Sequence, residues 1–373
     1  MMGKATMSAA LPLRTPPYLV DVAANLTDCV FRGVDWKGNR IHADDFDHML
    51  ARAQEHNVQQ IIITGTNLAQ SAKAIALCRR YPDRRLLCTV GVHPAHSGEF
   101  LRPLDHAAVE RVVQDDTSVV DAHYTRPDAC TAEVEEQHAA ERLAYLVDLI
   151  EKNRDVVVAV GEIGLDYAEL MCCPREVQAK YFERQLVAFA PLNLPFLFHS
   201  RECGMAFVQQ LQSTWPRCQR DAASSPSFSS SLRGVVHSFN GSREEQDTLL
   251  SMGLYLSVNG SAFRDKAVAD QVAAIPLHRL LLETDAPWCD VRPKDYGASF
   301  VTTTLRTIKR KKPFELGACL ERRNEPCHLV QVLEAYVGSR RVSPEIAESE
   351  RAEVDKEKVV AAVYENCHAL FGL

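Results

Sequence analysis

The sequence predicts an α/β fold in the form of a (β/α)8 barrel. Eight short apolar runs alternate with longer helical patterns along the chain, which is typical of repeated strand–helix units. Most runs are almost continuously apolar, as strands buried on both faces of a parallel sheet should be. The runs cover residues 18–23, 58–64, 86–92, 156–161, 194–199, 233–237, 253–259 and 279–284. A doubly wound open sheet fits the same runs and stays the structural alternative.

The segments between the runs predict amphipathic helices. In residues 44–57, for example, Phe46, Leu50 and Ala53 fall on one helical face. Further helices are predicted at 68–81 and 175–190. Three stretches lack this order and are expected to be loop insertions. They cover the acidic segment 114–140, the serine-rich segment 217–232 and the long connection 290–326.

The length and composition indicate one large globular unit. The chain has 373 residues, of which 46% are hydrophobic and 24% charged, so it is not a disordered chain. One α/β barrel uses about 200 to 250 residues or more. We therefore expect a single domain over 18–373 after a flexible tail at 1–17. The net charge of −7 excludes a uniformly basic nucleic-acid coat but leaves room for a local basic patch.

The cysteines and the apolar runs bear on the compartment. The twelve cysteines include no C-x-x-C pair, so we expect mostly reduced thiols in an intracellular protein. The sequence contains no run of 18 apolar residues, so no membrane span is predicted. The tail at 1–17 contains Lys4 and Arg14 but no acid, so a mitochondrial address stays open beside the cytoplasm and the nucleus.

Polar side chains occur where several apolar runs end. In a parallel barrel these ends meet at one mouth, where catalytic groups sit. Imidazoles and carboxylates gathered there would form a mixed site for a divalent metal. The strand-end residues are His93, Glu162, His199, His237 and Asp285. Each has a structural alternative when taken alone: Asp285 could cap a turn, and Glu162 could pair with Arg201.

Two later segments could bind phosphate. Residues 306–312 read RTIKRKK, with five cations in seven positions, which fits either a solvated loop or a phosphodiester contact. In RRNEP at 322–326, Asn324 is expected to cap the following helix with Pro326 in its first turn. The free amides of that helix start, with Arg322 or Arg323 nearby, could hold a phosphate. A simple capped helix remains the alternative.

The motifs as a set resemble the TatD family of metal-dependent deoxyribonucleases, and its eukaryotic branch most of all. They arrive in family order over nearly the whole chain from residue 18 to 373. The matching segments are DVAANLTD (21–28), ITGTN (63–67), VGVHP (90–94), AVGEIGLDY (159–167), FLFHSR (196–201), VVHSFNGS (235–242), LLLETDAPW (281–288) and RRNEP (322–326).

The resemblance implies a metal-dependent hydrolase of the TIM-barrel type. Its expected substrate is DNA, cut as a 3′→5′ exonuclease or endonuclease in DNA repair or fragmentation. Glu162 would contact both ions of a metal pair, with His199 and His237 completing the site of one ion. Asp285 would bind the other, and His93 would sit beside the scissile phosphate. The implied cofactor is a divalent metal, Mg²⁺ first and Mn²⁺ second, with one or two ions per chain.

One departure weakens one of the two expected metal sites. Many relatives carry two histidines as H-x-H after the first strand, where this chain has Ala23 and Asn25. Asn25 offers only an amide oxygen, and Ala23 offers no ligand. We therefore expect loosely held, water-rich Mg²⁺ or Mn²⁺ rather than tightly bound zinc.

The expected mechanism assigns a role to each strand-end group. Asp285 would accept the proton of the attacking water, Glu162 would bridge the metals, and His93 would act on the phosphate or the leaving 3′ oxygen with a pKa near neutrality. A fork from Arg201 could hold Glu162 or a phosphate. Asn67 and Asn259, also at strand ends, are expected to support the ligands from behind.

The expected partner is DNA, with a single strand or a 3′ end favoured, because a barrel mouth admits a splayed strand more readily than a duplex. No membrane and no obligate protein partner are expected. Two other functions were weighed: a small-molecule amidohydrolase, which would usually need the missing H-x-H pair, and a noncatalytic nucleic-acid-binding protein. The set of metal-binding residue types favours the nuclease over both.

Overall fold

The computed structural model describes residues 15–115, 131–222, 231–309 and 312–373. Its eight parallel strands pair in sequence order from first to last. This arrangement confirms the predicted barrel and excludes a doubly wound open sheet, in which the strand order would reverse. The strands are β1 (Leu19–Ala24), β2 (Val58–Ile63), β3 (Leu86–Val90), β4 (Val157–Asp166), β5 (Phe196–Arg201), β6 (Gly234–Val236), β7 (Tyr255–Val258) and β8 (Leu280–Leu282).

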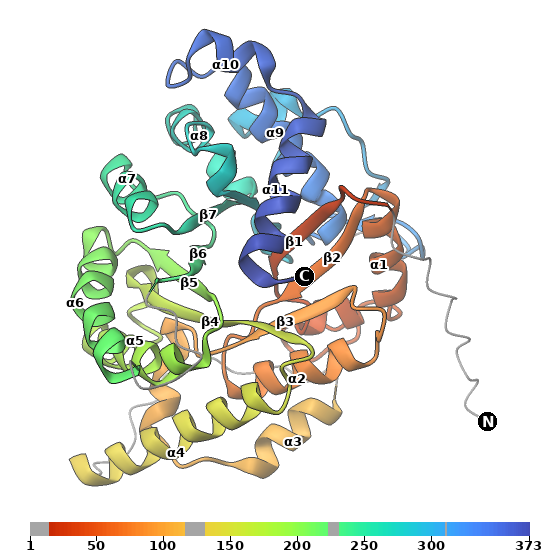
Figure 1. Cartoon of the computed structure of the whole chain (residues 1–373). Helices are drawn as coiled ribbons and strands as arrows, with labels where there is room; N and C mark the ends of the chain where they lie inside the picture. Colours follow the sequence, from red (N-terminus) through yellow and green to blue (C-terminus); the bar gives the residue numbers. More distant parts are fainter. Residues whose placement is uncertain (1–14, 116–130, 223–230, 310–311) are drawn as a thin grey trace.

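The helices form the outer layer around the ring of strands (Figure 1). Those predicted at 44–57, 68–81 and 175–190 are present as the first, second and fifth of them. The helices are α1 (Phe46–Glu55), α2 (Leu68–Arg79), α3 (His106–Gln114), α4 (Ala132–Glu151), α5 (Arg175–Phe189), α6 (Met205–Ala222), α7 (Arg243–Ser251), α8 (Lys266–Ala273), α9 (Leu329–Val342), α10 (Glu348–Glu353) and α11 (Lys356–Phe371).

The seam between β1 and β8 is closed by main-chain hydrogen bonds just beyond the strands. The N–H of Asp285 donates to the carbonyl of Ala23 at 2.9 Å, and the N–H of Asn25 donates to the carbonyl of Ala286 at 2.7 Å. The first and last strands therefore meet at the two residues, Asn25 and Asp285, that the sequence placed at the barrel mouth.

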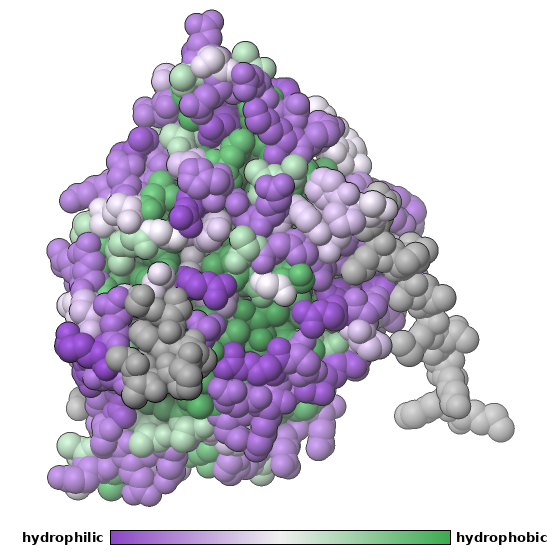
Figure 2. All heavy atoms as spheres, in the orientation of Figure 1, coloured by the Kyte–Doolittle hydropathy of each residue, from purple (hydrophilic) through white to green (hydrophobic). Residues whose placement is uncertain are grey.

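One end of the barrel interior is an apolar plug. Val20, Leu87, Leu197 and Leu281 form one buried cluster with Leu370 at the end of α11. Accordingly, the C-terminus lies over the middle of the ring of strands in Figure 1. Figure 2, drawn from the same side, shows hydrophilic side chains over the outer helices and apolar atoms gathered toward the middle. Polar chemistry is thus left to the opposite end, where the strands terminate.

The three predicted insertions are more regular than expected. Residues 132–140 are the start of α4, whose first turn carries Glu133 and Glu135, where acidic groups favour a helix. Residues 217–222 continue α6. The connection 290–326 contains a short parallel pair, β9 (Thr307–Ile308) with β10 (Cys319–Leu320). Residues 116–130, 223–230 and 310–311 lie outside the described part of the chain.

The predictions of a flexible tail and of no membrane span can be compared only with the described residues. Of the tail predicted at 1–17, residues 1–14 lie outside the described residues. Among the helices in the described ranges, none is long and apolar enough to cross a membrane.

Candidate metal centre

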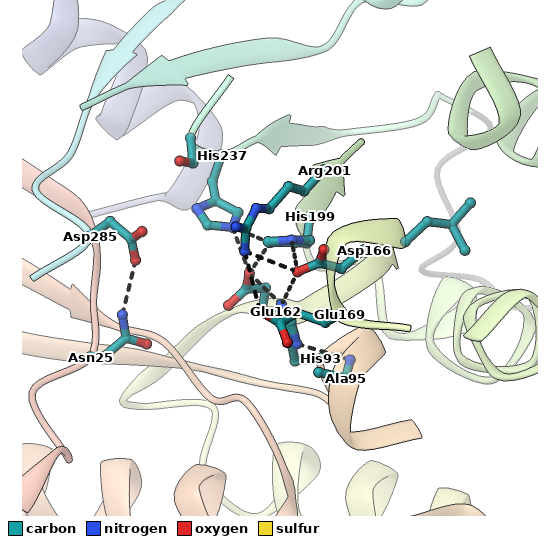
Figure 3. Close-up of polar contacts among 12 residues, drawn as sticks. Asn25, His93, Ala95, Glu162, Asp166, Glu169, His199, Arg201, His237 and Asp285 are labelled. Atoms are coloured by element: carbon teal, nitrogen blue, oxygen red, sulfur yellow. Dashed lines mark hydrogen bonds and ion pairs between the residues drawn. The ribbon is translucent and has the colours of Figure 1, made fainter. Parts of the chain in front are cut away.

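Four of the predicted residues come together at the carboxyl ends of neighbouring strands (Figure 3). Glu162 lies in β4 and His199 in β5, while His93 and His237 follow β3 and β6. The Oε1 atom of Glu162 lies 2.5 Å from Nδ1 of His199 and 2.6 Å from Nε2 of His237. It lies 3.6 Å from Nε2 of His93. Three imidazoles therefore surround one carboxylate oxygen.

The close approach of β4 to β5 depends on a glycine. Gly164 has a φ of +152°, and a Cβ atom built on it would collide with the carbonyl oxygen of His199. The glycine of the GLDY segment thus brings the two strands close enough for Glu162 and His199 to meet. Any side chain at this position would also be strained, since L-residues rarely adopt such a φ.

Each of two histidines is held from behind by a second carboxylate. Nε2 of His199 lies 3.1 Å from Asp166, and Nδ1 of His237 lies 3.3 Å from Glu283. A ring N–H donated to each of these acids leaves the other nitrogen of each ring facing Glu162. This carboxylate–histidine arrangement is the usual means of orienting an imidazole toward a metal.

The donor atoms then converge on one point. Nδ1 of His199 and Nε2 of His237 lie 3.0 Å apart, against the same oxygen of Glu162. Burial opposes a charged ring at His237, yet Glu162 and Glu283 outweigh it and raise the pKa of His237 well above its usual value. The site therefore attracts positive charge. A divalent ion supplies the charge of two protons from a single position, so these residues fit a divalent metal.

His93 differs from the other two histidines. Its Nδ1 accepts a hydrogen bond from the N–H of Ala95 at 3.1 Å, so the neutral ring carries its hydrogen on Nε2. Burial lowers the pKa of His93 to about 3. The expectation of a near-neutral pKa is therefore wrong for this site, because the ring is buried. In this tautomer His93 is a hydrogen-bond donor rather than a metal ligand.

Asp285 lies to one side of the cluster with Asn25 (Figure 3). The amide of Asn25 donates to Oδ1 of Asp285 at 3.0 Å, and the thiol of Cys289 donates to Oδ2 at 3.3 Å. Asp285 has a φ of +51°, a conformation that aspartate tolerates better than most residues. Burial raises the pKa of Asp285 to about 6. The carboxylate is thus poised between its two protonation states near neutral pH.

Comparison with known proteins identifies the family to which the chain belongs. A family model described as TatD related DNase matches residues 20–372, which is nearly the whole chain. The chain belongs to the TatD-related DNase family. The family resemblance noted in the motifs is therefore confirmed.

Named relatives and a solved structure agree with this membership. The deoxyribonuclease Tat-D of Schizosaccharomyces pombe is 35% identical, over 87% of this chain and 90% of its own. The 3′-5′ ssDNA/RNA exonuclease TatD of Erwinia tasmaniensis is 29% identical, over 85% of this chain and 90% of its own. The crystal structure of a TatD family hydrolase from Entamoeba histolytica superposes with a TM-score of 0.71 at 25% identity, covering 95% of this chain and 98% of that one.

Two acids of this TatD-type site were not singled out from the sequence. Asp166 stands four residues after Glu162 in β4, so both fall on one face of the strand. Glu283 accepts hydrogen bonds from Ser257 and, at 3.1 Å, from Asn259. The strand alternation could have revealed Asp166. The buried position of Glu283 behind His237 has no comparable signal in the sequence.

Other predicted residues of the TatD-type site lie outside the cluster. The side chain of Asn67 accepts from the N–H of Gln70 and caps α2, so its expected role behind the ligands is wrong. Arg201 lies 3.7 Å from Asp166 and 3.6 Å from Glu169, so it does not hold Glu162, and its alternative contact with a phosphate stays a prediction. Asn259 lies one step behind the cluster, through Glu283.

In the RRNEP segment, Arg323 and Asn324 make structural contacts, while Arg322 is exposed and its contact with a phosphate stays a prediction. The guanidinium of Arg323 is buried and donates to Asp45 and Glu325, so its expected phosphate contact is wrong. Glu325, not Asn324, caps the short helix η8 (Pro326–His328). The amide of Asn324 instead donates to the carbonyls of Thr284 at 2.8 Å and of Trp288 at 2.5 Å. It therefore braces the turn that carries Asp285.

Proposed function

We propose that this chain is a divalent-metal-dependent deoxyribonuclease that hydrolyses phosphodiester bonds at the barrel mouth. The observation that carries the proposal is the pair His199 and His237. Each is backed by an acid, and each turns one nitrogen toward Glu162. The family membership and the named deoxyribonuclease of Schizosaccharomyces pombe support DNA as the substrate.

The ion would be held by Glu162, His199 and His237. Asp285 lies to one side of these three residues, where Asn25 donates a hydrogen bond to it. A bound divalent metal supplies Lewis acidity, which activates water and neutralises charge on the phosphate. Asp285 would accept the proton of the attacking water, since its pKa, raised by burial to about 6, suits a base that works near neutral pH.

His93 would recognise the phosphate itself. Its Nδ1 is occupied by the Ala95 N–H, so its Nε2–H points toward the space beside Glu162 and Asp166, which lie 3.6 and 3.9 Å away. A neutral donor fixed in advance at this position stabilises negative charge as it develops on a phosphoryl oxygen. His93 would therefore act by donating a hydrogen bond, without changing its charge.

The ligand set leaves Mg²⁺ and Mn²⁺ as the ions to compare. Carboxylate oxygens suit both, while two imidazole nitrogens suit Mn²⁺ better than Mg²⁺. We propose Mg²⁺ as the working ion because of its abundance and the family resemblance, with Mn²⁺ supporting equal or faster cleavage. One ion is expected at Glu162, His199 and His237, and a second only with substrate, since Asn25 is a weak ligand.

A single strand entered from its 3′ end is the proposed form of the substrate. The relative from Erwinia tasmaniensis is named a 3′-5′ ssDNA/RNA exonuclease. Trp36 and Trp288 stack with ring centroids 5.1 Å apart, yet remain 48% and 47% exposed. They stand in the loops that follow β1 and β8, the strands that lead to Asn25 and Asp285. Exposed aromatic faces of this kind stack on unpaired bases.

The deciding experiment uses single-stranded DNA labelled at its 3′ or its 5′ end, with purified full-length protein. Cleavage is measured with Mg²⁺, Mn²⁺ or Zn²⁺ and after EDTA treatment, beside the variant His199→Ala. The proposal predicts metal-dependent loss of the 3′ label first and little cleavage by the variant. Cleavage that survives EDTA, or that is equal in His199→Ala, would contradict it.

A further inference from the structure

A second group of metal-binding side chains lies away from the barrel mouth. Cys319 begins β10, and Cys327 and His328 lie in η8 at the start of α9. Both cysteines are buried and His328 is half-buried. One ligand atom from each of the three residues lies within 4.8 Å of the others. The proposed nuclease chemistry uses none of them.

We infer that Cys319, Cys327 and His328 form a structural site for a tetrahedral divalent ion, with Zn²⁺ the preferred one. Glu325 is placed to serve as the fourth ligand. The inference does not depend on the proposed nuclease activity, since it rests on a different set of residues.

The distances match a tetrahedral site. With Zn–S bonds of about 2.3 Å and Zn–N bonds of about 2.0 Å, two sulfurs lie about 3.8 Å apart, and a sulfur and a nitrogen about 3.5 Å apart. The Sγ atoms of Cys319 and Cys327 are 3.7 Å apart, and Sγ of Cys327 is 3.7 Å from Nδ1 of His328. Sγ of Cys327 also lies 3.9 Å from Oε2 of Glu325. The three separations from Sγ of Cys327 are thus close to those in a zinc site, and one atom each of Cys319, Cys327 and His328 lies within 4.8 Å of the others.

The charges around the site balance with an ion bound. Arg52 and Arg323 form ion pairs with Asp45 and Glu325 in the same buried network. These two cations and two anions sum to zero. A divalent cation with two thiolates adds no further net charge, so the filled site leaves no uncompensated charge in the interior. Binding would release the two thiol protons to solvent.

His328 turns its Nδ1 atom toward the neighbouring main chain and the thiol of Cys327. Its Nδ1 lies 3.1 Å from both the N–H and the carbonyl oxygen of Glu325, and in the tautomer that leaves a lone pair on Nδ1 it accepts from that N–H. A bound ion would take over that lone pair, so occupancy replaces one helix-capping contact with a metal bond.

The ion would link the long connection 290–326, through Cys319, to the start of α9, through Cys327 and His328. Cys319 belongs to β10, which pairs with β9 of the cationic stretch 306–312, while Cys327 and His328 begin the helical region that follows. Asn324, three residues before Cys327, holds the carbonyls of Thr284 and Trp288. The site therefore supports the turn that carries Asp285 from behind.

The two candidate centres should prefer different metals. Thiolates select Zn²⁺ over Mg²⁺ and Mn²⁺, whereas the barrel cluster offers nitrogen and oxygen donors. Sulfur ligation can therefore be detected separately, because thiolate-to-cobalt charge-transfer absorption appears only when a cysteine binds the ion. Among the described cysteines, Cys289 is a partly exposed thiol that contacts Asp285, and Cys289→Ser serves as the matched control.

The test adds CoCl₂ and then ZnCl₂ to the reduced, full-length protein and records its near-ultraviolet and visible spectrum. We expect tetrahedral thiolate–cobalt bands that saturate at about one ion per chain and disappear when Zn²⁺ is added. Cys319→Ser and Cys327→Ser should lower these bands at least tenfold, while Cys289→Ser and His199→Ala keep them. A thermal melt of each variant establishes that it is folded.

Two results would overturn the inference, and the first needs no variant. Absence of thiolate–cobalt bands in the reduced wild-type protein would show that the cysteines bind no metal. A loss of two titratable thiols without reductant that is restored by reductant, and that Cys319→Ser abolishes, would show that Cys319 and Cys327 form a disulfide pair instead. Either result would leave the proposed nuclease untouched, since cleavage in Mg²⁺ is measured separately.

Discussion

Nδ1 of His237 lies 3.3 Å from Oε1 of Glu283, while Nε2 of the same ring lies 2.6 Å from Glu162. One imidazole thus joins a fully buried acid to the acid at the metal centre. Because Glu283 also accepts from Ser257 and Asn259, its position is fixed by three neighbours. The orientation of the ligand His237 is therefore fixed by Glu283, an acid that does not itself face the metal centre.

Glu283→Gln should weaken the metal centre without removing a ligand. The amide of glutamine has the size of the carboxylate but no negative charge, so it holds the N–H of the His237 ring less strongly. We expect metal affinity to fall about 10- to 100-fold, as for other acids behind a histidine ligand. The measurement is the Mn²⁺ concentration that gives half-maximal cleavage. Cleavage that recovers at high Mn²⁺ supports a positioning role, and an unchanged half-point would refute it.

His93→Ala should separate catalysis from metal binding. Since Nδ1 accepts from Ala95, Nε2 is a donor, and its loss should lower kcat about 10²- to 10³-fold. Metal affinity, measured by calorimetric titration of Mn²⁺, should stay within about threefold of wild type, because no ligand is lost. His199→Ala is the comparison and should lose the affinity itself. Equal losses of affinity in both variants would make His93 a ligand.

Trp288→Ala should impair the binding of single-stranded DNA. Stacking is worth about 1–3 kcal/mol per base, so KM should rise about 5- to 150-fold with little change in kcat. Trp288→Phe keeps an aromatic face and should recover most of the loss. Hydrolysis of bis(p-nitrophenyl) phosphate, which contains no base, reports the centre alone and should be the same in all three proteins. A drop in that rate would show that the indole supports the site instead.

Glu334→Gln should destabilise the fold far from the centre and in a pH-dependent way. Glu334 is buried in α9 and accepts from the N–H groups of Thr302 and Thr303 and from Lys356. Burial opposes its charge, but Lys356 and the two threonines outweigh burial and lower the pKa of Glu334 to about 2. We expect a loss of about 2 kcal/mol at pH 7.

The pH dependence follows from the sign of that shift. A carboxyl whose folded pKa is depressed stabilises the protein fully above its ordinary pKa, and this stability is lost as pH falls toward the folded value. The difference in stability between wild type and Glu334→Gln should therefore shrink between about pH 4.5 and pH 2. Glu353→Gln, which removes a surface contact with Lys358, is the control. A gap that stays constant with pH would show that Glu334 acts by packing alone.

The sequence predicted the barrel and most of its central residues for a physical reason. Strands that are buried on both faces must be apolar throughout, so a polar residue at a strand end stands out. Glu162, His199 and His237 were found in this way. The partners of other polar residues were assigned wrongly. Arg323 donates to the buried acid Asp45, and Asn67 accepts from the free N–H of Gln70 at the start of a helix.

Residues that act through a neighbour could not be found by the same rule. Glu283 lies inside a run that reads as an ordinary strand end, and its role appears only when Ser257, Asn259 and His237 meet it in space. The tautomer of His93 likewise depends on one N–H, that of Ala95, after the strand has ended. Spacing along the chain cannot give either relationship.

We propose that Glu162, held between His199 and His237, binds the metal on which the nuclease activity of this chain depends. The most direct test of this proposal compares cleavage of single-stranded DNA by wild type and Glu162→Gln in saturating Mn²⁺, with thermal melts as the check on folding. We expect a folded variant that is slower by about 10³-fold or more, because metal stabilisation is worth several kcal/mol. A folded variant that cleaves at close to the wild-type rate would contradict it.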